Sequence, residues 1–177
     1  MDFESFFEDI FHELQDRYEF SRTTLPMKDI HGLIPLLCLL GLAAWAMLLV
    51  SLQVGWRVVQ VLSMKKQANQ FPSGSPHGPE WYWRATRAHL NMVENLPVFG
   101  AIVVVGTLLG STGTYFSALS LIYFGARLIQ SLAHISSGSN LVVNIRFTFF
   151  AIQLFSATLM IFHILAQVSK TQHAVFH

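Results

Sequence analysis

The sequence predicts an all-α integral membrane protein whose core is a bundle of four membrane-spanning helices. Apolar residues make up 53% of the 177-residue chain and charged residues only 12%, which is about half the charged share of a soluble domain. Four apolar segments each exceed the roughly 20 helical residues that are needed to cross a bilayer. Three of these segments are separated only by short turns, which favour antiparallel neighbours in a bundle.

The first two predicted spans are joined by a long loop. The first span runs from about residue 33 to residue 64 and would be ~48 Å long, so its end should project beyond the lipid. A loop rich in Pro, Gly and Ser follows it and closes on an aromatic cluster at residues 81–83, which suits the membrane interface. The second span runs from about residue 84 to residue 109 and contains Pro97, which should kink it.

The last two predicted spans follow closely on the second. The third runs from about residue 114 to residue 135, and the fourth from about residue 141 to residue 168. A tight turn at residues 110–113 precedes the third span, and a short polar turn at residues 136–140 leads into the fourth. These short turns predict that the three helices run up and down beside the first.

The N-terminal residues form a separate extension in this prediction. Aromatic and aliphatic residues at helical spacing indicate an amphipathic helix, but its polar face is acidic rather than basic as in typical membrane-surface helices. The segment lacks the basic start and apolar core of a signal peptide, so packing on the bundle or a partner is favoured. The chain therefore divides into an acidic extension at residues 1–29, a transmembrane domain at residues 30–169 and a tail at residues 170–177.

Composition excludes several functional classes. The net charge of +1 argues against a nucleic-acid partner. The single cysteine, Cys38, excludes a disulfide framework. The sequence has no zinc-type Cys/His spacing, no phosphate-binding loop and no dinucleotide fingerprint, so we predict neither a metal site nor a nucleotide site.

Polar side chains on three of the predicted spans lie at matching depths in one half of the membrane, counted at ~1.5 Å per residue from the helix ends. They are Arg87, Asn91 and Glu94 on the second span, Arg127, Gln130 and His134 on the third, and Arg146 on the fourth. On each of the second and third spans the three residues share one helix face. Ionisable groups inside a membrane are costly and usually mark a functional site.

The charges in this layer do not balance. Its three arginines, with Lys65 and Lys66 at the rim, face a single carboxylate, Glu94. A purely structural pairing of Glu94 with Arg127 stays open, but it would leave the other cations unpaired, and buried unpaired cations are costly. An anionic ligand is the natural missing partner, and Glu94 would suit an ammonium group on it. The layer therefore predicts a site for a zwitterionic ligand of net negative charge.

Basic residues also predict the orientation of the chain. Lys65, Lys66, Arg84 and Arg87 flank the long loop, and Lys and Arg are enriched on the cytosolic side of membrane proteins. We therefore place the loop and the charged layer on the cytosolic side and both termini outside the cytosol.

The second span resembles that of the membrane-associated proteins in eicosanoid and glutathione metabolism, the MAPEG family. Bacterial members carry a motif close to R-A-H-x-N-x-x-E-N-x-P-x-F, which is matched here by Arg87, Ala88, His89, Asn91, Glu94, Asn95, Pro97 and Phe99. The end of the first span is similar to the V-I-S-x-basic-basic sequence of glutathione-conjugating members, matched at residues 61–66. A G-P-x-E stretch of those members resembles the sequence at residues 78–80. The resemblance covers about residues 33–168.

The resemblance implies a four-helix subunit that assembles as a homotrimer and binds glutathione between subunits near the cytosolic side. By position, the glutathione ligands would be Lys65, Lys66, Arg87, Asn91, Glu94, Arg127, Gln130 and His134. Gln130 and His134 depart from the family pattern, in which tyrosines are common. Arg146 is the candidate for the arginine that stabilises the glutathione thiolate.

The activity implied by the resemblance is glutathione transfer or peroxidation on a lipophilic electrophile that enters from a bacterial inner membrane. One alternative is a non-catalytic lipid-binding or scaffold protein in which the charged layer has a structural role. A small transporter with an anion site inside the membrane is a second alternative, although no internal repeat supports it.

Overall fold

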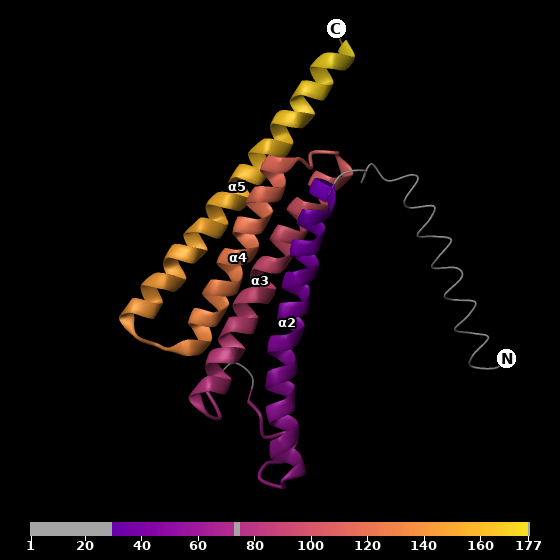
Figure 1. Cartoon of the computed structure of the whole chain (residues 1–177). Coiled ribbons are helices and arrows are strands. Elements are labelled where there is room, and N and C mark those ends of the chain that lie inside the picture. Colours follow the sequence, from indigo (N-terminus) through magenta and orange to yellow (C-terminus); the bar gives the residue numbers. More distant parts are fainter. Residues whose placement is uncertain (1–29, 73–74, 177) are drawn as a thin grey trace, which may run out of the picture.

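The computed structural model describes residues 30–72 and 75–176, and the predicted N-terminal helix lies outside them (Figure 1). Within the described residues the chain forms four helices and no strand. The helices are α2 (Ile30–Leu62), α3 (Glu80–Leu108), α4 (Thr114–Ser136) and α5 (Asn140–Phe176). All four are long and apolar enough to cross a membrane, which confirms the predicted fold class.

Two helices are longer than the sequence predicted. Helix α3 begins at Glu80 rather than at residue 84, directly after the extended Pro79, and an acidic residue suits the first turn of a helix. Helix α5 continues to Phe176, past the predicted end at residue 168. No glycine or proline follows residue 168, so nothing in the sequence terminates the helix there.

The four helices run up and down, and the loop end of the bundle is at the bottom of Figure 1. Helix α2 packs against α3 and α4, and α5 packs mainly on α4. Helix α5 has only sparse contact with α3 and does not pack on α2 in the described part of the chain. The bundle is therefore open between α3 and α5, and this opening contains the site described below.

The core lies between the four helices, and α5 contributes Ala157, Met160 and Ile164 to it. Phe99 is fully buried and its ring stacks on Tyr123, with 4.1 Å between the ring centroids. At Gly106 a Cβ atom would lie 2.6 Å from the Phe116 ring, so this close approach of α3 to α4 requires glycine. Helix α3 continues through Pro97 without interruption. The outer faces of the helices carry exposed leucine, valine and phenylalanine side chains, as expected of a surface that contacts lipid.

Cationic and aromatic side chains hold the long loop against α2 and α3. Tyr82 is fully buried, and its hydroxyl accepts a hydrogen bond of 2.6 Å from Arg57 Nε. The Trp56 ring lies on Tyr82, with 4.2 Å between centroids, and Lys66 Nζ lies 5.6 Å from the Phe71 ring centroid. Tyr82 is thus a buried packing residue, whereas the neighbouring Trp81 is exposed.

Substitution of Gly78 by alanine should loosen this loop. Gly78 has a φ of +77°, and a Cβ atom would lie 2.6 Å from the Trp56 ring. The left-handed conformation alone costs a non-glycine residue roughly 1–2 kcal/mol, so trypsin should cleave after Lys65 and Lys66 faster than in the wild type. Gly138→Ala is the matched control because a Cβ there meets no atom within 4 Å. Equal cleavage rates in both variants would contradict this account of the loop.

Candidate functional site

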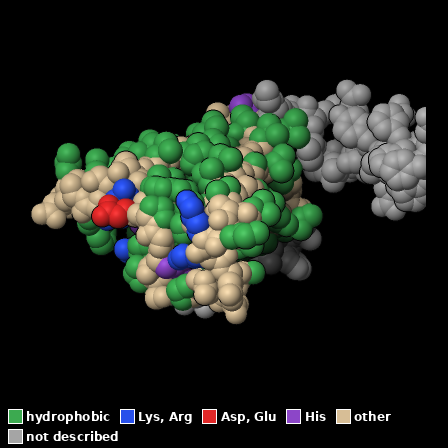
Figure 2. Space-filling model, turned by 90° about the horizontal axis from the view of Figure 1, so that it is seen from below, with side chains coloured by type: hydrophobic (Ala, Val, Ile, Leu, Met, Phe, Trp, Pro, Cys, Tyr) green, Lys and Arg blue, Asp and Glu red, His purple; other side chains and the backbone are tan. Residues whose placement is uncertain are grey.

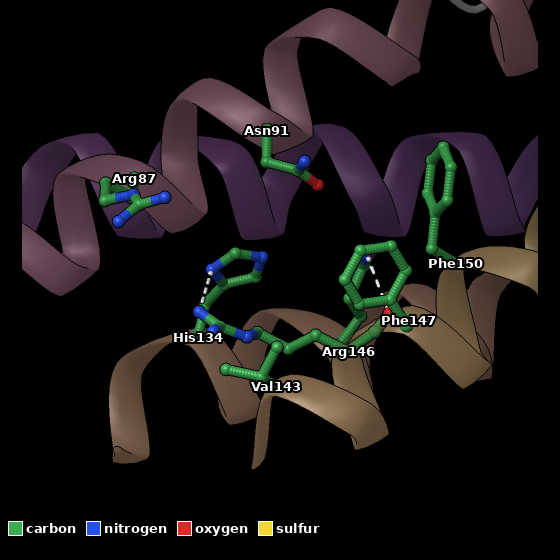
Figure 3. Close-up of a pocket in the computed structure, with 8 residues that line it drawn as sticks. Arg87, Asn91, His134, Val143, Arg146, Phe147 and Phe150 are labelled. Carbon is green, nitrogen blue, oxygen red and sulfur yellow. Dashed lines mark hydrogen bonds between the residues drawn. The ribbon is translucent and has the colours of Figure 1, made fainter. Parts of the chain in front are cut away.

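A pocket of about 360 Å³ opens between α3, α4 and α5 near the loop end of the bundle (Figure 3). The residues that line it are Arg87, Asn91, Gln130, His134, Val143, Arg146, Phe147 and Phe150. Its volume lies in the lower part of the range of small-molecule pockets, roughly 300–1,000 Å³. Five of the predicted site residues, from three helices, therefore meet at one cavity.

Helix periodicity and the antiparallel order of the helices bring these side chains together. Arg87 and Asn91 are four residues apart on α3, so they share one face, and Figure 3 shows them opposite α4 and α5. Gln130 and His134 have the same spacing near the end of α4. Since α5 starts directly after the next turn, Arg146 lies at a similar depth. Seen from below in Figure 2, basic and histidine side chains lie among hydrophobic ones at this end of the bundle.

Arg146 is held in place by α4. Its Nη1 lies 3.1 Å from His134 Nδ1, and its backbone carbonyl accepts a 3.3 Å hydrogen bond from Gln130 Nε2. A guanidinium group can only donate, so His134 Nδ1 accepts and the imidazole proton resides on Nε2. Both side chains are half-buried. The arrangement fixes a cation and a neutral imidazole at the wall of the pocket.

The pocket combines positive charge with an apolar wall. Arg87 and Arg146 are cations, and none of the eight lining residues is acidic. Val143, Phe147 and Phe150 form an apolar side on α5. A ligand that fits this lining has an anionic part to pair with the arginines and an apolar part to lie against α5.

Arg127 lies behind the pocket rather than in its lining. Only 2% of its surface is exposed. Its guanidinium donates to Gln130 Oε1 at 2.6 Å, to Gln153 Oε1 at 3.0 Å and to the backbone carbonyl of Asn91. Sequence reasoning missed Gln153, although a glutamine in the middle of an apolar span, seven residues after Arg146, is a usable signal.

Three further predicted site residues are absent from the lining of the pocket. Glu94 is exposed on α3 and forms no ion pair with Arg127 within the described residues. Lys65 is exposed in the loop, and Lys66 stacks on the Trp56 and Phe71 rings. A single chain therefore brings together only part of the predicted set.

Arg84, which also flanks the long loop, connects the start of α3 to the end of α4. Its Nε donates to the carbonyl of Ile135 at 3.1 Å, and its Nη1 pairs with Glu80 at 2.8 Å. These contacts link the start of α3 to the end of α4, on which His134 lies.

Comparison with family models gives a match that covers most of the chain. The model described as MAPEG family matches residues 35–166, which is 132 of the 177 residues and includes every residue that lines the pocket. The chain belongs to the MAPEG family. This membership and the four spanning helices make it an integral membrane protein. A search of curated proteins finds no match to this MAPEG protein.

Proposed function

We propose that this MAPEG protein binds glutathione in the pocket between α3, α4 and α5 and acts as a glutathione transferase or peroxidase. The observation that carries the proposal is a pocket with two arginines, two amides and no acidic lining residue. Glutathione has two carboxylates, one ammonium group and a thiol, so it is anionic at neutral pH. Arginine binds carboxylates through two parallel hydrogen bonds, and we assign this role to Arg87, with Asn91 completing the contact.

Arg146 is the residue that we assign to the thiolate. A free thiol has a pKa of ~8.5 and is mostly protonated at neutral pH, whereas an adjacent cation favours the nucleophilic thiolate. In transfer, the thiolate attacks an electrophilic carbon, a carbon–sulfur bond forms and the leaving group departs with its electron pair. In peroxidation, the thiolate attacks a peroxide oxygen and the alcohol departs. A second glutathione then forms the disulfide and releases water.

An apolar groove between α3 and α5 supports the proposal that the co-substrate is lipophilic. Ala101, Ile102 and Val105 of α3 and Ile161, Ile164 and Leu165 of α5 line a second pocket of about 260 Å³. The same pair of helices borders the glutathione pocket, and Ala101 lies ~15 Å further along α3 than Asn91. An electrophile from the bilayer would approach the thiolate along this apolar face.

We further propose that the protein works as a homotrimer in a bacterial inner membrane, with the pocket on the cytosolic side. Lys65, Lys66 and Glu94 are not among the residues that line the pocket within one chain. A neighbouring subunit that places these three residues at the pocket would add cations for the glutathione carboxylates and an acid for its ammonium group. The trimeric MAPEG arrangement with glutathione between subunits supports this assignment.

Replacement of Arg87 by alanine tests the proposal. Titration calorimetry of glutathione into detergent-purified protein should show saturable binding that weakens at least tenfold in Arg87→Ala, since a charged hydrogen bond contributes about 1.5–3 kcal/mol. Lys170→Ala, an exposed cation at the far end of α5, should leave the affinity unchanged. Absence of binding at millimolar glutathione, in folded wild-type protein, would favour the non-catalytic lipid-binding or scaffold alternative.

A further inference from the structure

Within the described part of the chain, the hydrogen-bond acceptors of the buried cation Arg127 are all neutral. They are the side-chain oxygens of Gln130 and Gln153 and the backbone carbonyl of Asn91. A buried guanidinium normally has a carboxylate partner because an unpaired charge is costly to bury. Here amide dipoles solvate the cation, but they do not cancel its charge.

Gln153 is the central residue of this arrangement. It is 2% exposed, and its Nε2 donates to Gln130 Oε1 at 3.0 Å and to the Phe149 carbonyl at 2.9 Å. These two bonds turn its own oxygen toward Arg127. Gln130 Oε1 accepts from both Arg127 and Gln153, and Gln130 in turn lines the pocket. One buried network therefore joins Arg127 to the pocket wall.

The positive charge of Arg127 adds to that of the pocket itself. Arg87 and Arg146 line the cavity, and Arg127 lies directly behind Gln130. Glu94 is exposed on α3 and forms no ion pair with Arg127 in the described chain. Charges in a poorly hydrated protein interior act over longer distances than charges in water.

We propose that Gln153 is a specificity-determining residue, because its neutral amide accepts a hydrogen bond from Arg127 without cancelling the charge, so that the pocket selects anionic over neutral or cationic ligands. A glutamate of nearly the same shape would form an ion pair with Arg127 and remove this charge. The inference rests on the proposed function only in taking this pocket as the ligand site. It concerns the charge of the ligand and not its identity as glutathione.

The electrostatic potential in the pocket can be measured without glutathione, from the reactivity of a cysteine placed in the lining. Val143 lines the pocket and is half-buried, so Val143→Cys in a Cys38→Ala background provides a reporter thiol. Its thiolate attacks the sulfur of a methanethiosulfonate reagent, a mixed disulfide forms and methanesulfinate departs. Comparing a sulfonatoethyl reagent with a trimethylammonioethyl reagent gives an anionic-to-cationic rate ratio in which the thiolate fraction cancels.

In the full-length reporter protein, Gln153→Glu should lower this ratio by roughly threefold to tenfold, as expected for the loss of one unit charge near the reporter. Gln153→Met removes the hydrogen bonds but adds no charge, and the ratio should stay within about twofold of that of the parent. Arg127→Gln is the second variant, and it should lower the ratio as Gln153→Glu does. Circular dichroism and size-exclusion chromatography identify the folded variants.

A ratio that stays constant in folded Gln153→Glu or Arg127→Gln, while Arg87→Ala lowers it, would overturn the inference. A fall in Gln153→Met equal to that in Gln153→Glu would also overturn it, since a packing change would then explain both. Glutathione titration of the same proteins separates the two proposals. If the rate ratio falls in Gln153→Glu but the protein does not bind glutathione, only the proposed function is refuted. If the protein binds glutathione but the rate ratio does not change in Gln153→Glu, only the inference is refuted.

Discussion

Replacing Arg146 with alanine should lower the turnover number for glutathione conjugation by roughly 100-fold, while part of the glutathione affinity is retained. Removal of one group that stabilises negative charge at the reacting atoms typically lowers the turnover number by about this factor. Arg87 and Asn91 lie on the opposite side of the pocket and still hold the peptide. The measurement is steady-state conjugation of a generic lipophilic electrophile, with calorimetry on the same preparation.

Arg146→Lys is the matched variant for this prediction. It keeps the charge but loses the forked donor geometry that reaches His134 Nδ1, so its activity should lie between that of the wild type and Arg146→Ala. Unchanged turnover in Arg146→Ala, with binding lost in Arg87→Ala, would refute the thiolate role. An inactive wild-type protein would point to the scaffold alternative, and gradient-driven flux of an anion would point to the transporter.

Arg127→Ala is expected to be the most destabilising of these substitutions, by about 3 kcal/mol or more. The side chain is 2% exposed and bonds to one residue on each of α3, α4 and α5. Its removal leaves a cavity. The side-chain oxygens of Gln130 and Gln153 and the Asn91 carbonyl then lose their charged hydrogen-bond donor. A thermal melt in detergent should show a markedly lower midpoint.

Arg84→Ala is the control for the stability measurement. The side chains of Arg84 and Glu80 are 30% and 87% exposed, so their ion pair contributes about 1 kcal/mol or less. The hydrogen bond from Arg84 to the Ile135 carbonyl adds about 1 kcal/mol, so the total loss should stay below that in Arg127→Ala. Equal losses of stability in Arg84→Ala and Arg127→Ala would show that the buried network does not hold the three helices together.

The number of spans and their approximate bounds follow from the sequence, because span length and hydropathy are local properties. The fold class and the family resemblance are confirmed. The helix ends are less predictable, as the extra turns of α3 before residue 84 and of α5 after residue 168 demonstrate. A hydropathy pattern shows which residues suit the membrane, but it does not show where a helix that extends beyond the membrane begins or ends.

The charged layer was predictable as a layer, but its internal pairing was not. Helical periodicity determined by itself that Arg87 shares a face with Asn91, and that Gln130 shares one with His134. Only the tertiary structure decided that Arg127 meets Gln153 instead of Glu94, and that Glu94 is exposed and does not line the pocket. The physical reason is that spacing along one helix defines its faces, whereas the rotation of each helix toward its neighbours depends on packing between residues far apart in the chain.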